Sequence, residues 1–218
     1  MIFYKIYRIL LFYFFALLIT TTYFSFTALA EAPKNYLKGK FYTSVKNHFL
    51  VATEKMTDDR FRKTVIVMLD NDKEGSLGLV INKPIGKVPL KFLINTLQDS
   101  KNEKKELYEV NIPIYWGGPV EKEQIYILHS QEYKNENTKD YNGISITRDY
   151  NILFDIAENK GPKKSLVILG YSGWGEGQLE GEIDQDHWIL SEFNPLVVFE
   201  MESNNKWLKA HENGFIRL

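Results

Sequence analysis

The first 30 residues have an unbroken apolar pattern that separates them from the rest of the chain. Their only charged residues are Lys5 and Arg8, and no charge lies between positions 9 and 26. The stretch ends in Ala28, Leu29 and Ala30. A basic start, an apolar middle and a small-x-small end are typical of a secretory signal peptide. About 18 apolar residues also approach the length of a membrane span, so a retained N-terminal anchor is the alternative prediction.

These interpretations place the chain in different compartments. If residues 1–30 are functional, we expect export to the periplasm, or anchoring in a membrane through contacts made by residues 9–26. A mis-assigned start is the third interpretation, and it leaves a cytoplasmic protein. The charge bias does not set an orientation, because two basic residues precede the apolar stretch and several lysines follow it closely.

From about residue 38 the apolar runs become short and alternate with turn-forming residues. Runs rich in β-branched and aromatic side chains predict strands. They lie at 49–52, 64–69, 77–81, 112–116, 125–129, 144–146, 165–169, 188–190 and 196–199. Apolar residues at helical spacing predict helices at 90–97 and 152–157, followed by a short helix from Gln178 and a terminal helix from Ser203.

Polar segments between these runs predict the connections. Residues 70–75 end in a glycine and predict the turn of a hairpin, whereas 100–106 and 131–141 are expected to form surface loops. Asp149 is the expected N-cap of the second helix, and Gly161-Pro162 ends it. Because strand pairs joined by tight turns are interleaved with helices, we predict an α/β fold: a mixed sheet with antiparallel pairs and helices packed on it, forming one domain over 37–218.

Composition removes several classes of chemistry. The chain of 218 residues has no cysteine, which excludes disulfides, zinc–thiolate sites, iron–sulfur ligation and a thiol nucleophile. Its formal net charge is −1, and without residues 1–30 the remainder has 25 basic against 28 acidic residues. That balance, with no helix-turn-helix that has a basic recognition helix, argues against direct DNA binding.

The most unusual segment is 170–182, which contains five glycines between a predicted strand and a predicted helix. Phosphate-binding loops occupy that place, but the glycine spacing does not match G-x-G-x-x-G. Residues 176–186 contain five acidic residues and no lysine or arginine, so they would repel an anion. Two interpretations remain. The segment is a tight glycine turn that lets Trp174 pack and then caps a helix, or it is a surface that recognises a neutral or cationic group.

Ser172 is a candidate nucleophile that the local sequence disfavours. A nucleophile elbow needs G-x-S-x-G, and here the bulky Trp174 takes the place of the second glycine. His187 and Asp184 are available as a base and its orienting group, but nothing in the sequence places them beside Ser172. Hydrolysis is therefore a minor hypothesis.

Metal binding is also disfavoured. The segment starting at Asp70 begins like a calcium loop, with Gly75 at the sixth position, but its twelfth residue is Ile81 where a bidentate glutamate is required. The four histidines are scattered and form no H-x-x-x-H pair. His129 ends an apolar strand and is expected to be a buried or edge histidine. We therefore expect no metal and no cofactor.

Several segments, in order along the chain, together resemble the AlgH/YqgE family of bacterial proteins. The resemblance covers about residues 37–216. It rests on 49–52 (FLVA), 56–61 (MTDDRF), 75–84 (GSLGLVINKP), 116–120 (WGGPV), 128–129 (LH), 169–180 (LGYSGWGEGQLE), Glu182, Trp188, Trp207 and 214–216 (GFI).

The resemblance implies a compact mixed α/β fold and little about chemistry. Members of the family are described as transcriptional-regulator-like, from a genetic link to alginate control, or as of unknown function, and they have no agreed DNA-binding motif or catalytic residues. Alanine is common in the family where this chain has Ser172. Family members usually start near Leu37 and are cytoplasmic, so the apolar leader at 1–30 is a departure that conflicts with a cytoplasmic regulatory role.

We therefore predict a non-catalytic binding or regulatory module with an unknown protein partner or small ligand. The alternative is an enzyme of unknown reaction that uses Glu180, Glu182 or His129 as acid or base in a pocket. A third possibility is that the glycine turns only shape the fold. The expected recognition surface comprises Asn82, Lys83, Pro84, Gly117, Gly118, Trp174, Gln178, Glu180 and Glu182.

Overall fold

The computed structural model describes residues 45–95 and 105–216. The predicted leader at 1–30 and most of the charged loop predicted at 100–106 lie outside the described residues. None of the helices in the described part of the chain has the length and apolar character that a membrane crossing needs.

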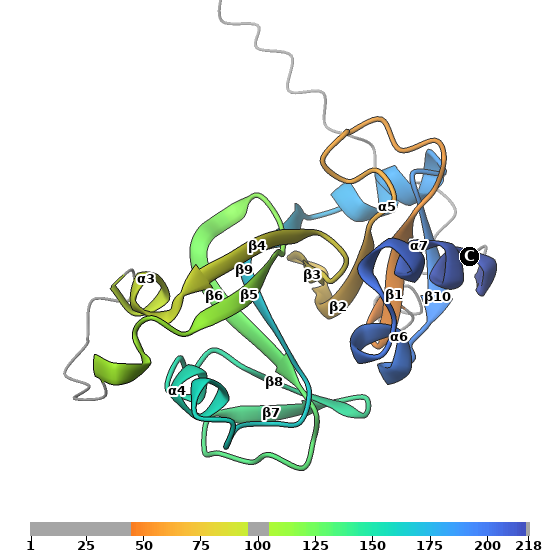
Figure 1. Cartoon of the computed structure of the whole chain (residues 1–218). Coiled ribbons are helices and arrows are strands. Elements are labelled where there is room, and N and C mark those ends of the chain that lie inside the picture. Colours follow the sequence, from red (N-terminus) through yellow and green to blue (C-terminus); the bar gives the residue numbers. More distant parts are fainter. Residues whose placement is uncertain (1–44, 96–104, 217–218) are drawn as a thin grey trace, which may run out of the picture. The chain divides into compact units, whose positions relative to one another are not determined.

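One 11-stranded sheet organises the described residues (Figure 1). Its main path runs in the order β11-β10-β1-β2-β3-β9-β6-β8-β7, and β5 joins it at β9 and carries β4. The strands are β1 (His48–Ala52), β2 (Val65–Asp72), β3 (Gly75–Val80), β4 (Pro84–Pro89), β5 (Asn111–Trp116), β6 (Val120–His129), β7 (Thr138–Tyr141), β8 (Ile144–Thr147), β9 (Ser165–Gly175), β10 (Trp188–Glu192) and β11 (Gly214–Ile216).

Among the described strands the pairs are antiparallel, except that β5 runs parallel to β9. The predicted mixed sheet with antiparallel pairs is therefore confirmed, but the described chain is mostly strand and its helices are short. They are α3 (Leu90–Asn95), the 3-10 helix η1 (Lys105–Leu107), α4 (Ile152–Ala157), α5 (Gln178–Asp184), α6 (Pro195–Phe199) and α7 (Ser203–Glu212). The label α/β holds only in this coarse sense.

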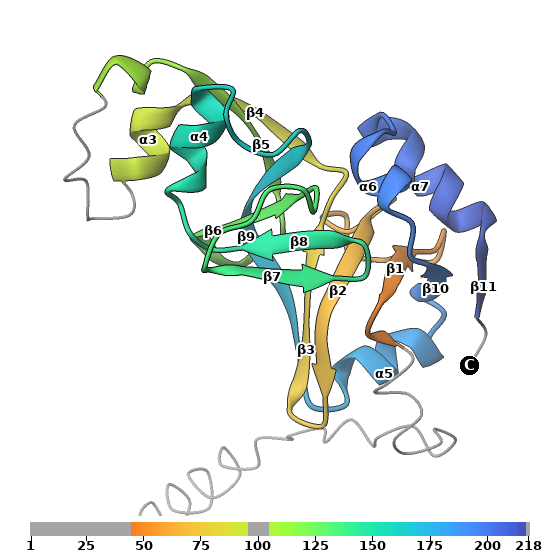
Figure 2. The same ribbon diagram turned by 90° about the horizontal axis from the view of Figure 1, so that it is seen from below.

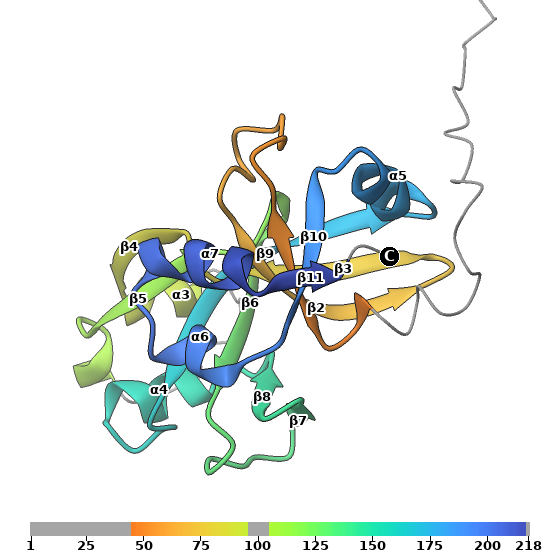
Figure 3. The same cartoon turned by 90° about the vertical axis from the view of Figure 1, so that its right-hand side faces the viewer.

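Helices cover both faces of the part of the sheet formed by β1, β2, β3 and β10 (Figure 3). Successive side chains of a strand point to opposite faces. Phe49 and Val51 of β1 belong to the core cluster that includes α6 and α7. Leu50 and Ala52 belong to the cluster that includes α5. The near-continuous apolar runs of these strands follow from this double burial.

A third core cluster holds the other end of the sheet. Buried residues of α3 and α4 pack there against β5, β6 and β9 (Figure 2). The i, i+3, i+4 spacing of Leu90, Leu93 and Ile94 correctly predicts α3 and its buried face.

One predicted strand is wrong because local chain chemistry outweighs the hydrophobic pattern, and one predicted loop is correct only in part. Residues 196–199 form helix α6 and not a strand. Asn194 accepts a hydrogen bond from the Leu196 backbone N–H at 2.9 Å, and Pro195 occupies the first helical turn. The loop predicted at 131–141 ends in strand β7, which pairs with β8.

Smaller differences concern caps and exposed strands. The N-cap of α4 is Asn151 and not Asp149. The Asp149 carboxylate instead accepts hydrogen bonds from the backbone and side-chain N–H groups of Asn151. The sequence does not predict the mostly exposed strand β4, because proline at both ends and Gly86 inside it are residues that strands disfavour.

Candidate functional site

The glycine-rich segment is a strand before it becomes a turn. β9 continues through its first half to Gly175, so the tight glycine turn expected within 170–182 begins only after that residue. The turn comes at Gly177, which has φ +71° and is the N-cap of α5. The backbone N–H of Gly175 donates to Gln178 Oε1 at 3.1 Å. This connection places Trp174, at the end of β9, beside α5.

The Glu182 carboxylate holds two tryptophan side chains in place. Glu182 Oε2 accepts the indole N–H of Trp174 at 3.0 Å and that of Trp188 at 2.7 Å. Glu182 Oε1 accepts from Gln178 Nε2 at 2.9 Å. A buried indole N–H needs an acceptor, and one carboxylate supplies it for both rings. The two rings therefore meet edge to face, with centroids 5.9 Å apart.

Four aromatic rings from distant segments form a continuous row, which we call the aromatic row. Trp116 contacts Phe61 with ring centroids 5.4 Å apart. Phe61 contacts Trp188 at 5.6 Å, and Trp188 contacts Trp174. These residues come from the β1–β2 loop, β5, β9 and β10. Aromatic rings at such distances attract one another in preferred orientations, in addition to the stabilisation that their burial provides.

Two depressions of similar size flank this row. The aromatic pocket has a volume of about 440 Å³ and is lined by Met56, Thr57, Asp58, Arg60, Phe61, Pro119, Gly173, Trp174, Gln178, Glu182, Gln185, His187 and Trp188. The basic pocket also has a volume of about 440 Å³ and is lined by Asp59, Arg60, Lys83, Pro84, Ile85, Trp116, Pro119 and Lys122. The pockets share Arg60 and Pro119, so they adjoin.

Charges in the β1–β2 loop are largely compensated within the loop. Arg60 and Asp58 form a bidentate pair, with Arg60 Nη2 2.6 Å and Nε 3.0 Å from the two carboxylate oxygens. The hydrogen bond from Arg60 lowers the pKa of Asp58. Arg62 Nε lies 2.9 Å from Asp59 Oδ1. Both pairs are exposed enough that they stabilise the fold little.

The structure places five of the predicted surface residues in these pockets. Lys83 and Pro84 line the basic pocket, and Trp174, Gln178 and Glu182 line the aromatic pocket. Segments about 90 residues apart in sequence are brought together because Pro84 pairs with Tyr115 across β4 and β5, and Ser76 pairs with Trp174 across β3 and β9.

Asn82, by contrast, lies beneath the surface and is only 8% exposed. Its Oδ1 accepts the Val65 backbone N–H at 2.9 Å, and its Nδ2 donates to the Lys63 carbonyl at 2.8 Å. The side chain therefore joins the β3–β4 connection to the end of the β1–β2 loop and the start of β2.

Gly117 and Gly118 are buried against the backbone of β9. A Cβ atom on Gly117 would lie 2.2 Å from the Gly170 carbonyl oxygen. Gly118 has φ +155°, and a Cβ there would lie 2.1 Å from the Tyr171 carbonyl group. Only glycine fits this approach. The pair sets the position of Pro119, which contacts both pockets.

Glu180 faces inward from α5 and lines neither pocket. It is 8% exposed, and burial raises the pKa of its carboxyl group. A buried glutamate on this face supports a role in the packing of α5 more readily than direct recognition.

The residues of the enzyme hypothesis are not gathered in one place. His129 is fully buried and pairs with Ser165, at the opposite end of β9 from Trp174. The nine residue-to-residue steps from Ser165 to Trp174 span about 30 Å of strand. His129 Nδ1 lies 3.0 Å from the Ser130 carbonyl oxygen, and burial lowers the pKa of the imidazole. It is the buried histidine that the sequence predicts.

Ser172 is likewise a structural residue. It is buried, and its Oγ donates to the Gly117 carbonyl at 3.0 Å. This bond joins β9 to the buried glycine pair, so the hydroxyl is not presented to either pocket.

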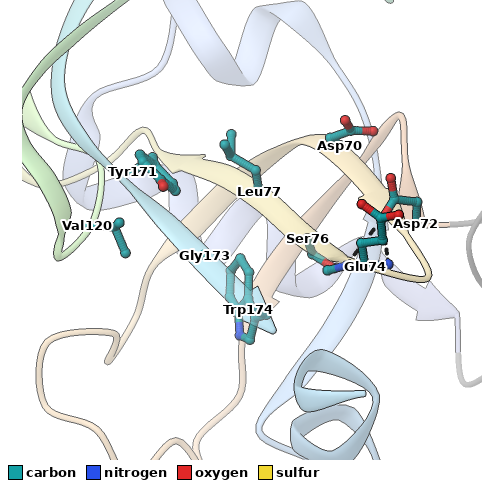
Figure 4. A pocket seen from close by; sticks show the side chains of 10 residues that line it. Asp70, Asp72, Glu74, Ser76, Leu77, Val120, Tyr171, Gly173 and Trp174 are labelled. Carbon is teal, nitrogen blue, oxygen red and sulfur yellow. Dashed lines mark hydrogen bonds between the residues drawn. The ribbon is translucent and has the colours of Figure 1, made fainter. Parts of the chain in front are cut away.

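A third depression lies on the β2–β3 hairpin and is acidic (Figure 4). Its lining includes Asp70, Asp72 and Glu74 together with Leu77, Val120, Tyr171 and Trp174. Asp72 Oδ1 accepts the backbone N–H groups of Glu74 and Gly75, as a hairpin turn requires. No group of three potential metal ligands converges within residues 45–95 and 105–216.

Several residues that line the pockets are not predicted from the sequence. Arg60, Phe61, Trp116, Lys122 and Trp188 were not among the predicted surface residues, although three of them are aromatic. The one signal in the sequence is that Trp116 directly precedes the Gly117-Gly118-Pro119 turn, whereas no glycine or proline adjoins Phe61 or Trp188.

The fold is that of a small protein built on one mostly antiparallel sheet, with a glycine-rich end to strand β9. The family model described as AlgH-like matches residues 49–217. The chain therefore belongs to the AlgH-like family.

Relatives and solved structures agree with this assignment. A UPF0301 protein of Pseudomonas putida strain W619 is 35% identical over 162 residues, which cover 74% of this chain and 84% of the relative. A UPF0301 protein of Rickettsia prowazekii is 35% identical over 173 residues, covering 78% and 89%. The solution structure of AlgH from Pseudomonas aeruginosa matches with a TM-score of 0.65 and 31% identity, covering 78% of this chain and 88% of that chain.

A more distant crystal structure shares the fold alone. Protein DIP2367 of Corynebacterium diphtheriae matches with a TM-score of 0.58 at 16% identity, covering 84% of this chain and 96% of that chain.

Proposed function

We propose that the chain is a non-catalytic binding module whose recognition surface consists of the aromatic pocket and the basic pocket. One observation carries the proposal: four distant segments supply one aromatic row, and adjoining depressions flank it. Phe61 and Trp116 are the partly exposed rings of the row, whereas Trp174 and Trp188 are buried. Aromatic side chains and arginine often dominate binding energy at interfaces.

The hydrogen bonds of the aromatic pocket favour binding over proton transfer. Both oxygens of Glu182 already accept hydrogen bonds from neighbouring side chains. The histidine that lines this pocket, His187, comes from the turn before β10. A surface whose rings and carboxylate are fixed before a ligand arrives loses little side-chain entropy on binding.

We further propose that any regulatory role acts through a protein partner and not through direct contact with DNA. The support is the acidic balance of the chain and the small number of lysines in the basic pocket. A DNA-binding surface needs many phosphate contacts, and its affinity falls steeply with salt. Binding to duplex DNA with such a salt dependence would contradict this proposal.

The test compares a purified partner with variants of the pocket. Partners captured from native extract by the full chain are identified, and their affinities are then measured with purified proteins. Phe61→Leu and Gln178→Ala alter the aromatic pocket, and Lys73→Ala in the exposed β2–β3 turn is the matched control. We expect pocket variants that remain folded to weaken binding about tenfold, which is about 1.4 kcal/mol. Unchanged affinity for both the Phe61→Leu and the Gln178→Ala variant would overturn the assignment of the surface.

A further inference from the structure

We infer that the basic pocket docks an acidic segment of a protein partner. A carboxylate of that segment lies between Lys83 and Lys122, and a neighbouring apolar side chain lies against Trp116. This inference rests on the proposed function and specifies the chemistry of what one half of the surface recognises.

Charge is the first argument. Lys83 and Lys122 form no ion pair with any residue that the structure describes, whereas Arg60 is paired with Asp58 and Asp59 with Arg62. The two lysines therefore bring to the pocket positive charge that no ion pair neutralises among the described residues, in a chain whose overall balance is acidic; Glu121 and Glu123 line the neighbouring depression with Lys122. An anionic group of a partner complements this local charge.

The apolar floor is the second argument. Pro84, Trp116 and Pro119 line the pocket beside the lysines, and Ile85 at its rim is 55% exposed. A free inorganic anion would make no use of these surfaces. An acidic residue followed by an aromatic or aliphatic residue would fill both the charged and the apolar parts.

The pocket is also held ready for a ligand by the backbone. The Trp116 backbone N–H donates to the Lys83 carbonyl at 2.9 Å, and Pro84 pairs with Tyr115. Lys83 and Trp116 therefore stay side by side whether or not the pocket is occupied. Such preorganisation lowers the entropy cost of association.

The openness of the depression favours a peptide over a small metabolite. Sites for small molecules bury about 70–90% of their ligand's surface. This pocket has a largely exposed isoleucine at its rim and adjoins a second pocket through Arg60 and Pro119. A segment of chain can cross such a surface and continue beyond it.

The experiment uses the full chain and two synthetic peptides. The probe is acetyl-Gly-Asp-Phe-Asp-Gly-amide, and its neutral counterpart has asparagine at both acidic positions. Binding is followed by NMR at the indole N–H signals. We expect the acidic peptide to bind about three- to tenfold more tightly than the neutral one, the range of one or two exposed ion pairs. The difference should shrink as salt is added.

Variants locate the effect. Lys83→Gln and Lys122→Gln should each remove most of the preference for the acidic peptide. Lys87→Gln, on the exposed part of the same strand β4, is the matched control and should preserve it. Phenylacetate is a third probe: if it binds as tightly as the acidic peptide, the site takes small aromatic acids and the inference is wrong.

Failure of the inference and failure of the proposed function give different results. If both peptides bind equally and only Phe61→Leu weakens them, the aromatic row binds and the docking of an acidic segment is wrong. If neither peptide perturbs any indole signal at millimolar concentration, the inference is overturned, and the proposed function is then judged on its purified partner.

Discussion

Lys206 is a buried lysine whose charge should make stability depend on pH. Its side chain is 2% exposed, and its Nζ donates to the Val198 carbonyl at 2.7 Å and the Ile81 carbonyl at 3.2 Å. The Tyr115 ring centroid lies 5.8 Å away. No carboxylate forms an ion pair with Lys206 among the described residues. Burial lowers the pKa of this ammonium group from 10.5 to about 8.

The direction of the effect follows from proton binding. Below pH 8 both the folded and the unfolded chain hold the Lys206 proton, and the cost of the buried charge is fully present. Between pH 8 and 10.5 the unfolded chain still holds the proton while the folded chain has lost it. The free energy of unfolding therefore rises with pH across this window. A displacement of this size corresponds to about 3 kcal/mol in total.

The assay compares the chain with its Lys206→Met variant by urea unfolding at pH 7 and pH 10. Methionine fills a similar volume and cannot titrate. We expect the stability of the natural chain relative to the variant to increase by about 2–3 kcal/mol between these pH values. Tyr133 and Tyr141, whose pKa values are raised to about 12, lower stability above pH 10 equally in both proteins and cancel. Parallel pH profiles would refute the reasoning.

Three further predictions concern the site and its frame. Glu182→Gln should lower the free energy of unfolding by about 1–3 kcal/mol, because an amide cannot accept all of the hydrogen bonds that the carboxylate accepts; urea unfolding checks this, with exposed Glu176→Gln unchanged. Gly118→Ala should lower the free energy of unfolding by at least about 3 kcal/mol, because the added Cβ clashes with the backbone. Gly86 has φ +146° but open space around it, so Gly86→Ala should lower the same free energy by only about 1–2 kcal/mol. Lowering the pH below 6.5 should reduce stability through the depressed pKa of His129, because the unfolded chain binds that proton first; His129→Asn should flatten this part of a thermal-unfolding profile, and an unchanged slope would contradict it.

The sequence correctly predicts those elements in which the turn and capping residues indicate the same structure as the hydrophobic pattern. The β2–β3 hairpin follows from two apolar runs around Asp72 and Gly75, and α5 from Gly177 followed by helix-forming residues. The strand prediction for residues 196–199 is wrong because their apolar run fits a strand as well as a buried helix. The capping by Asn194, which decides between them, is a single hydrogen bond.

The site is harder to predict than the fold, because its residues meet through strand register. Trp174, Gln178 and Glu182 are close in sequence, and their grouping can be expected from a glycine turn followed by a helix. Phe61 and Trp116 join them only because the β1–β2 loop and the end of β5 reach the same edge of the structure. No local pattern contains that information.

Burial also divides the predicted surface residues into two groups that composition alone could not separate. Asn82, Gly117 and Gly118 are buried and shape the backbone beneath the pockets. Trp174 is only 6% exposed and forms part of a pocket wall, while Lys83 is partly exposed. The glycines are needed because β9 passes too close for any side chain, and that approach places Pro119 between the two pockets. A substitution in the first group should therefore lower stability and binding together. A substitution of Lys83 should change binding alone, and this difference separates the frame from the recognition surface.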